Sequence, residues 1–209
     1  MNKFIEGRSE LLAQKTIKGL ESRNIGAQYA PTKEDALRLA LDLIPTGAAI
    51  GMGGCMSARE IGLFDALKQG DYNFIDRDLY ADQREALLLT YDADWFLASP
   101  NALTDDGVLV NIDGNSNRVS CIAQGPRHVL FIAGIDKVCP DVDSAIKRAR
   151  NVAAPTNAQR FDVRTPCKKV GRCMDCKSPN TICCNFLITR FSHHPGRMHL
   201  ILVGEHLGF

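Results

Sequence analysis

The sequence predicts an α/β protein with a mostly parallel sheet, helices on both faces of that sheet, and a C-terminal cysteine-rich loop followed by strands. Short apolar runs alternate with segments whose apolar residues recur at helical spacing. Turn-forming glycine, proline, asparagine and aspartate residues separate these segments. The chain has 209 residues and is 45% hydrophobic, which is enough to bury a substantial core. We therefore expect an α/β core over residues 1–164, with residues 165–209 in the same domain.

In the first half of the chain, helices and strands are expected to alternate regularly. Thr32 suits the start of a helix because its hydroxyl can accept a backbone N–H bond, and Pro45 stops that helix. Ser57 and Glu60 fit a capping box at the start of another. The expected elements are a helix over 4–20 that ends near Asn24 or Gly26, a strand over 27–30, a helix over 33–44, a strand over 48–52, a helix over 57–68, a strand over 72–75, a helix over 79–91 and a strand over 94–98.

The second half is expected to be less regular. The pattern changes past Pro155, and the following cysteine-rich stretch has no periodicity, so it is expected to be an irregular loop. A long loop of this kind needs something other than a core to hold it, and a bound metal would serve. The expected elements are strand or strand–helix pieces over 108–112 and 118–122, a buried strand over 128–133, a helix over 141–151, the loop over 165–185, and strands over 186–189 and 198–203.

The charge balance and the N-terminal sequence limit the partners and the location of the protein. The 25 basic and 24 acidic residues nearly cancel to a net charge of +1, so neither nucleic acid nor an anionic membrane surface is expected as a partner. No stretch approaches the ~20 apolar residues of a spanning helix. Charged residues interrupt the first segment, so no export signal is expected and the cytoplasm is the predicted location.

The cysteines are unevenly distributed, because five of the 8 lie between Cys167 and Cys184. A reducing compartment disfavours disulfides, so this group suggests metal binding. Four thiolates that include a Cys-x2-Cys pair can bind tetrahedral zinc or a [4Fe–4S] cluster, and the alternative is a metal-free loop. Cys121 and Cys139 lie in or beside apolar runs and are expected to be small buried side chains. The predicted ligands are Cys167, Cys173, Cys176 and Cys183.

A glycine-rich loop joins the strand over 48–52 to the next helix. Gly51, Gly53 and Gly54 let the backbone approach a ligand closely, and Ser57 begins a helix whose first N–H groups are unpaired. A phosphate or carboxylate group would fit there, although the spacing matches neither the dinucleotide fingerprint nor the Walker loop. The alternative is a tight strand-to-helix turn without a ligand.

A second polar segment lies between two hydrophobic strands and includes Asn111, Asp113 and Asn115. Such side chains can hydrogen bond a hydroxylated substrate, and loops at the carboxyl ends of parallel strands meet at one crevice. We therefore expect this segment to border the same cavity as the glycine loop. Ordinary turn chemistry is the alternative, because Asp-Gly occurs twice in this region.

These motifs, in this order, make the chain resemble LUD-domain (lactate-utilisation) proteins over nearly its whole length. The matching runs are residues 53–62, 103–115, 150–155, 165–167, 173–179 and 201–209. The resemblance implies a fold similar to the sugar-phosphate isomerase, CoA-transferase and formyltetrahydrofolate cyclo-ligase superfold. It also implies that the glycine loop contacts phosphate or carboxylate groups through Gly51, Gly53, Gly54 and Ser57.

Two positions depart from the family's pattern. Cys55 stands where serine is expected, which bears on the polarity of the loop. Cys184 stands where asparagine is more usual, which leaves the fourth metal ligand open between Cys183 and Cys184. The family setting of redox metabolism favours [4Fe–4S] over zinc and suggests iron–sulfur oxidoreductase subunits as partners.

Two classes of function remain open at this stage. One is an enzyme, or enzyme subunit, of lactate or related organic-acid utilisation that binds a small organic acid or a phosphate-bearing ligand. The other is a non-catalytic accessory or electron-transfer protein, or one whose zinc site is only structural. The sequence alone assigns no catalytic residue, and it leaves the oligomeric state open, with a homodimer as one option.

Overall fold

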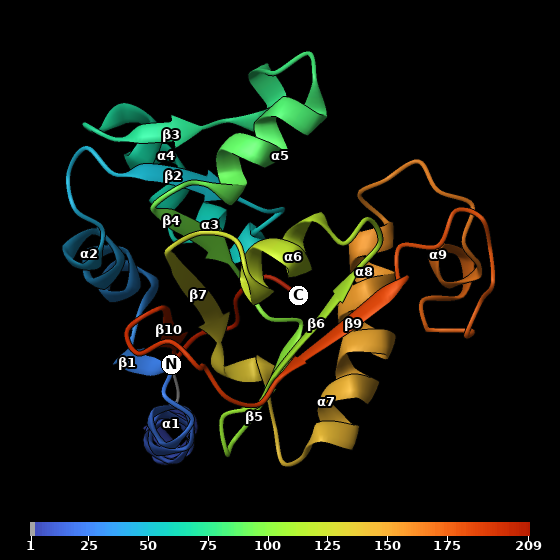
Figure 1. Cartoon of the computed structure of the whole chain (residues 1–209). Coiled ribbons are helices and arrows are strands. Elements are labelled where there is room, and N and C mark those ends of the chain that lie inside the picture. Colours follow the sequence, from blue (N-terminus) through green and yellow to red (C-terminus); the bar gives the residue numbers. More distant parts are fainter. Residues whose placement is uncertain (1–2) are drawn as a thin grey trace.

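The structure is a computed structural model that describes residues 3–209, so Met1 and Asn2 of the expected core lie outside it. A six-stranded parallel sheet forms its centre, with helices on both faces, which confirms the predicted fold class (Figure 1). In spatial order the strands are β1 (Gly26–Ala30), β10 (Met198–Val203), β7 (His128–Gly134), β4 (Trp95–Ala98), β2 (Ala49–Met52) and β3 (Asn73–Ile75).

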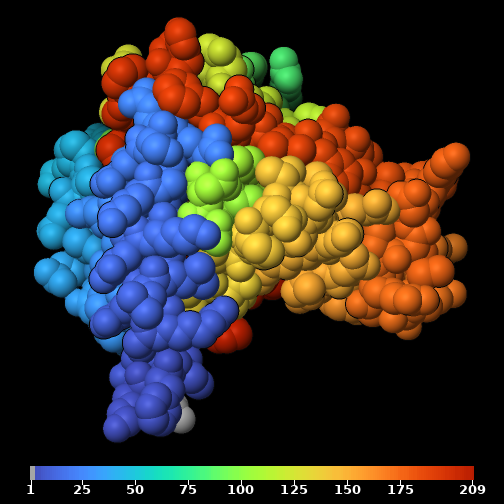
Figure 2. Space-filling view, turned by 90° about the horizontal axis from the view of Figure 1, so that it is seen from below, coloured from blue at the N-terminus to red at the C-terminus, as the bar shows by residue number. Residues whose placement is uncertain are grey.

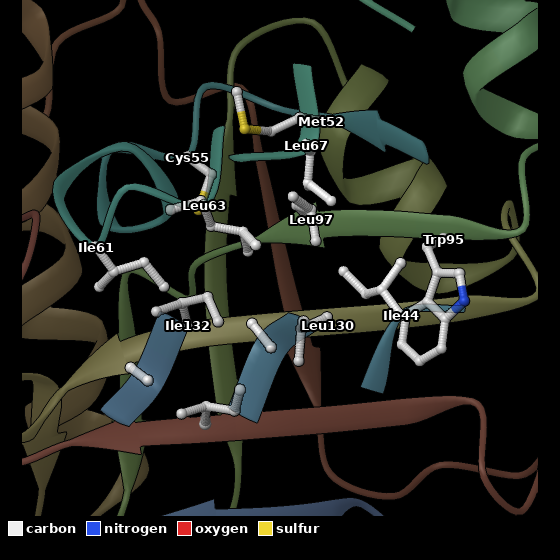
Figure 3. Close-up of a cluster of buried hydrophobic side chains, with 14 of the residues drawn as sticks. Ile44, Met52, Cys55, Ile61, Leu63, Leu67, Trp95, Leu97, Leu130 and Ile132 are labelled. Carbon is white, nitrogen blue, oxygen red and sulfur yellow. The ribbon is translucent and has the colours of Figure 1, made fainter. Parts of the chain in front are cut away.

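Two apolar clusters cover the two faces of this sheet. One contains Leu130 and Ile132 of β7 together with α2, α3 and α4, and Figure 3 shows how their side chains interlock. The other contains Val129 and Phe131 together with α1, α5 and α6. Neighbouring residues of β7 thus enter opposite cores, which is why this strand is a continuous apolar run. The helices are α1 (Lys3–Ser22), α2 (Lys33–Leu43), α3 (Met56–Glu60), α4 (Leu63–Gln69), α5 (Gln83–Tyr91) and α6 (Asn117–Ala123).

A second, four-stranded sheet is formed by strands from the middle and the C-terminal part of the chain. Its strands run in the order β8, β5, β6 and β9, with antiparallel pairing of β6 to both β5 and β9. The strands are β5 (Ala102–Thr104), β6 (Leu109–Asp113), β8 (Val138–Cys139) and β9 (Asn185–Thr189). The helical segments beside it are α7 (Val142–Arg148), the π-helical η3 (Ala149–Ala153) and α8 (Ala154–Ala158). Among the described residues, no helix is both long enough and apolar enough to cross a bilayer.

The expected capping box is wrong. α3 begins with Cys55 as its N-cap and has no side-chain cap bond, because the Ser57 side chain turns inward to Ser99 and Lys137. Glu60 accepts a bond from the backbone N–H of Gly208 instead. The expected helix over 57–68 is also divided, since Gly62 adopts a φ of +81° between α3 and α4.

Other expected boundaries are corrected as well. The helix over 79–91 is a 3₁₀ turn, η1 (Arg77–Leu79), followed by α5. The helix expected over 141–151 continues through Pro155, because η3 places an i→i−5 bond from the Ala154 N–H to the Ala149 carbonyl just before the proline. The expected loop over 165–185 contains a short helix, α9 (Pro166–Val170). In Figure 2 this orange segment projects as a lobe from the body, on a different side from the protruding start of α1.

Candidate functional site

A cavity lies at the carboxyl ends of three adjacent strands of the parallel sheet, β7, β4 and β2. Its volume is about 390 Å³. Gly53 follows β2, Ser99 follows β4, and Lys137 lies in the 3₁₀ turn η2 (Ile135–Lys137) that follows β7. α/β sheets commonly bind their ligands at this edge, where successive loops converge. Residues from the polar segment after β6, from α8 and from the C-terminal tail complete the wall.

The glycine loop forms one side of this cavity, although its members differ in position. A Cβ on Gly53 would lie 3.1 Å from Cδ of Arg118, and one on Gly54 would lie 3.6 Å from a guanidinium nitrogen of Arg160. Both glycines line the cavity, whereas Gly51 lies buried in β2, where its Cα faces Thr90. Gly51 therefore serves the packing of α5 on the sheet.

The cysteine at the position where serine was expected lies at the wall of the cavity but is turned into the core. Cys55 is 3% exposed and its side chain packs with Ile61 and Leu63 in the core (Figure 3). Burial raises the pKa of this thiol, so it stays protonated and behaves as a small apolar group. The polarity at this end of the cavity comes from Ser57 and its neighbours instead.

Lys137 is the least expected member of the site. Its side chain is 1% exposed, and Nζ lies 2.8 Å from Oγ of Ser99 and 3.4 Å from Oγ of Ser57. Among residues 3–209, no carboxylate forms an ion pair with it. Desolvation by burial is the largest cause that lowers its pKa from 10.5 to about 8, with Arg148 lowering it further. A neutral amine is therefore available near physiological pH.

Arg118 spans the floor of the cavity. Its two terminal nitrogens donate to the side-chain oxygens of Asn111 and Asn101 and to the carbonyls of Ser99 and Ile112. Burial lowers its pKa, with Asp113 opposing the shift, but guanidinium remains protonated. All four of these acceptors are neutral, so no hydrogen bond of the guanidinium balances its positive charge, and Asp113 opposes that charge only through space.

The polar segment lies at the same cavity, but its members do different things. Asp113 and Asn115 line the cavity, while Asn111 is fully buried behind it. The two oxygens of Asp113 accept four backbone N–H bonds, from residues 115, 116, 118 and 119. A carboxylate saturated in this way holds the start of α6 in place. Asn115 is exposed and free to face a ligand.

Three arginines gather at the mouth of the cavity. Arg77 and Arg160 line it, and Arg59 lines a smaller adjoining hollow together with both of them. Burial lowers the pKa of Arg160, and the charges of Arg59 and Arg77 lower it further. Like charges held this close together repel one another, and an anion between them would relieve the repulsion.

The four predicted cysteine ligands surround a separate cavity of about 60 Å³ between α8, α9 and the start of β9. Cys184 does not line this space, so the geometry favours Cys183 as the fourth member. Among the described residues, no three His, Cys, Asp or Glu side chains are arranged to hold a single metal ion. A [4Fe–4S] cluster makes a different demand, because each thiolate binds a different iron and the four sulfurs stand apart around the cluster.

Arg150 contributes the nearest positive charge to this cysteine cavity. It lies in the π-helical segment η3, and one of its guanidinium nitrogens is 3.3 Å from Sγ of Cys173 and 2.5 Å from a carboxylate oxygen of Asp175. The backbone N–H of Asp175 also donates to Sγ of Cys173, at 3.4 Å. N–H donors to sulfur and a nearby cation both stabilise thiolate ligands, so the residues present fit such a cluster.

The two cavities are neighbours. Ile182 lines both, and a Cβ on Gly114, in the loop after β6, would lie 3.1 Å from its Cα. Ile182 therefore belongs to the walls of both cavities. Of the predicted site residues, Gly53, Gly54, Ser57, Asp113 and Asn115 meet at the larger cavity and the four cysteines at the smaller.

Sequence reasoning missed Ser99, Lys137, Arg150 and Arg160. Ser99 and Lys137 stand just past the ends of expected apolar strands, where parallel sheets place their functional groups, and that position was a usable signal. Arg150 lies within the helix expected over 141–151, but nothing in that pattern showed that it faces the cysteines. Arg160 lies just past α8, which continues beyond the expected end of that helix.

Comparison with known proteins gives a consistent result. A family model described as the LUD domain matches residues 13–203 of the chain. No curated protein matches the sequence. Among solved structures, the crystal structure of a DUF162-family protein from Deinococcus radiodurans is similar, with a TM-score of 0.52 and 13% sequence identity, covering 93% of this chain and 98% of that one. At that identity the likeness shows the fold.

Proposed function

The chain belongs to the LUD-domain family, and we propose that it serves the utilisation of lactate or a related organic acid by binding a carboxylate or phosphate group in the larger cavity. The observation that carries this proposal is the surplus of positive charge there. Arg77, Arg118, Lys137 and Arg160 line the cavity, and the one acidic side chain among the lining residues, Asp113, is already saturated by backbone N–H groups. An anionic ligand would balance this charge.

The size of the cavity narrows the choice of ligand. At about 390 Å³ it lies in the range of small-molecule sites and exceeds what a lactate ion alone would fill. An organic acid that carries an activating or phosphate-bearing group would fill it better. Such a ligand would have two anionic groups. One would lie near Lys137 and Arg118, and the second would lie between Arg160 and Arg77 at the mouth of the cavity.

Ligand-induced stabilisation tests this proposal. Melting temperatures would be measured with lactate, glycolate, inorganic phosphate, acetyl phosphate and coenzyme A. We expect at least one anion to raise the melting temperature of the wild-type protein, and Arg160→Gln and Gly54→Val to reduce that rise. Arg84→Gln is the matched control, because Arg84 is exposed on α5 away from the cavity. Equal responses in all four proteins would refute binding at this site.

We further propose that Cys167, Cys173, Cys176 and Cys183 hold a [4Fe–4S] cluster, with zinc as the alternative. The supporting observation is the room between the cysteines. Zinc bonds each sulfur at about 2.3 Å and leaves no free volume, whereas the space here is about 60 Å³. A cluster at this place would supply one-electron chemistry next to the larger cavity, across Ile182. Such a role suggests iron–sulfur oxidoreductase subunits as partners.

Anaerobic purification tests the metal centre. We expect brown protein with iron and inorganic sulfide in equal amounts and broad absorption near ~400 nm that bleaches with dithionite. Cys176→Ser should lose most of the iron, and Cys184→Ser should keep it, because Cys184 lies outside the cysteine cavity. Colourless protein with stoichiometric zinc would overturn the cluster, and full iron content in Cys176→Ser would remove the site.

A further inference from the structure

Two serine hydroxyls and one lysine amine form a triangle in the wall of the larger cavity. Oγ of Ser99 lies 2.8 Å from Nζ of Lys137 and 3.1 Å from Oγ of Ser57, and Nζ lies 3.4 Å from Oγ of Ser57. The three residues come from the end of β4, the start of α3 and the turn η2. Long-range folding therefore assembles the triangle, and no local turn explains it.

The two serines differ in access. Ser57 is fully buried, and a Cβ on Gly208 would lie only 2.6 Å from its Oγ, so the C-terminal tail closes over it. Ser99 is half-buried and lines the cavity at the carboxyl end of a central strand. Ser57 also lines the cavity, but only Ser99 is partly exposed, so its hydroxyl is the better placed of the two to meet a ligand.

Lys137 is placed to remove a proton from that hydroxyl. A distance of 2.8 Å lies within the range for proton transfer between a base and its partner. The charged form of Lys137 is disfavoured because the amine is buried without a carboxylate partner among the described residues. With a pKa of about 8, Lys137 is unprotonated in part of the molecules near neutral pH, and in these the adjacent Ser99 is an activated nucleophile.

We infer that Ser99 and Lys137 act as nucleophile and general base in acyl transfer from an organic acid activated by a phosphate-bearing leaving group. This inference rests on the proposed function, because it uses the same cavity and the same class of anionic ligand. It goes further by making the protein an enzyme and by naming the group that attacks. Ser57 is a positioning residue that holds Ser99 and Lys137 in place.

The step balances without an outside oxidant or reductant. Nζ of Lys137 takes the proton of the Ser99 hydroxyl while Oγ bonds to the acyl carbon. The bond from that carbon to the oxygen or sulfur of the leaving group then breaks, and Lys137 returns the proton to the leaving group. Water, deprotonated in turn by Lys137, then attacks the acyl carbon of the Ser99 ester. The bond from that carbon to Oγ breaks, Lys137 returns the proton to Oγ, and the organic acid is released.

The charges of the site suit this chemistry. Negative charge develops on the acyl oxygen during attack, and Arg118, which donates to the Ser99 carbonyl at 3.2 Å, stabilises it electrostatically. The phosphate of the leaving group would lie between Arg160 and Arg77 at the mouth. An acyl phosphate and an acyl-coenzyme A thioester share this chemistry, and the experiment separates them.

The test is covalent trapping. Full-length protein would be incubated with acetyl phosphate in one arm and acetyl-coenzyme A in the other, quenched in acid, and analysed by intact mass and peptide mapping. We expect one acetyl group on Ser99 in the arm that carries the true leaving group. Lys137→Met should slow acetylation by at least about 100-fold, the usual range for loss of a general base. Ser120→Ala, on α6 and outside the triangle, should acetylate like the wild type.

The pH dependence separates a base from a structural lysine. The acetylation rate should rise with pH and reach half its maximum near pH 8, the pKa that Lys137 has when Cys55, Asp136, Glu60 and Arg148 face it. Acetyl groups on any residue other than Ser99, or a rate that ignores pH around 8, would overturn the inference. Anion stabilisation without acetyl–Ser99 would also overturn it while leaving the proposed function standing. Site mapping in the wild type keeps the test valid even if Ser99→Ala fails to fold.

Discussion

Replacing Lys137 with methionine is expected to stabilise the folded protein at neutral pH, although it removes the proposed base. Burial is the main cause that lowers the pKa of this lysine from 10.5 to about 8. At roughly 1.4 kcal/mol per pKa unit, the folded state bears a penalty of about 3 kcal/mol for holding the ammonium group. Methionine has a similar length and no charge, so it removes the penalty.

Two hydrogen bonds are lost in the same change. Nζ donates to Ser99 and Ser57, and each bond is worth about 1 kcal/mol or less, so the net gain should be about 1–2 kcal/mol. For a chain of this size that corresponds to a rise of roughly 2–8 °C in melting temperature. A functional residue that lowers stability is the usual sign of a trade-off between activity and folding.

The sign of the effect depends on pH. Below pH 8 the lysine is protonated in both the folded and the unfolded chain, so the folded wild type bears the full penalty. Between pH 8 and 10.5 the unfolded chain binds more protons, so the wild type gains stability from this group as pH rises. The advantage of Lys137→Met should therefore shrink over this interval and reverse above it, where only the lost hydrogen bonds remain.

Urea unfolding of both proteins at matched pH values on either side of 8 measures this difference, and comparing the two proteins cancels the titration of other groups. Lys18→Met is the control, because Lys18 is exposed on α1 and its replacement should change stability by less than about 0.5 kcal/mol at every pH. A variant that is less stable than the wild type by the same amount at every pH would refute the reasoning.

Two further changes test the scaffold of the cavity. Gly51→Ala should lower the free energy of unfolding by about 1–3 kcal/mol, because its Cβ would collide with the Thr90 side chain. Thr90→Ser removes the colliding methyl group, so the double variant should regain part of the lost stability. Asp113→Asn should lower the free energy of unfolding, measured with urea, by about 1–3 kcal/mol, because an amide nitrogen cannot accept the N–H bonds that the carboxylate oxygen accepts. The control is Asp42→Asn, which should have little effect because Asp42 is exposed.

The parallel sheet could be predicted because each of its strands can be recognised in the sequence by itself. Each buried strand is a short apolar run, and helices of recognisable periodicity separate the runs. β5 and β8 have only three and two residues, too few to show any period, so the second sheet was not expected. The capping box at Ser57 failed for a different reason, since a lysine 80 residues away in sequence engages that hydroxyl and no local pattern records it.

The residues of the site also fall into those that the sequence could predict and those that it could not. The convergence of Gly53 and Asp113 on one cavity follows from the rule that loops at the carboxyl ends of parallel strands meet. The cysteines could be singled out in the sequence because they are clustered at short spacings. One serine and one lysine that lie far apart in the sequence form no such pattern. Their relation exists only after β4 and β7 have paired, and it is therefore a property of the fold.

The distribution of unfavourable features argues independently that the larger cavity serves a ligand. Lys137 is buried without an ion-pair partner among the described residues, and Nδ2 of Asn111 is the one buried side-chain nitrogen or oxygen among them that lacks a hydrogen-bond partner. Both features cost folding free energy. Lys137 lines the cavity, and Asn111 accepts a bond from Arg118, which also lines it. Elsewhere a buried cation such as Arg197 is satisfied by three backbone carbonyls. Selection for stability alone would remove such local costs, so their place beside one cavity supports the proposal that a bound anion, or the chemistry performed on it, maintains them.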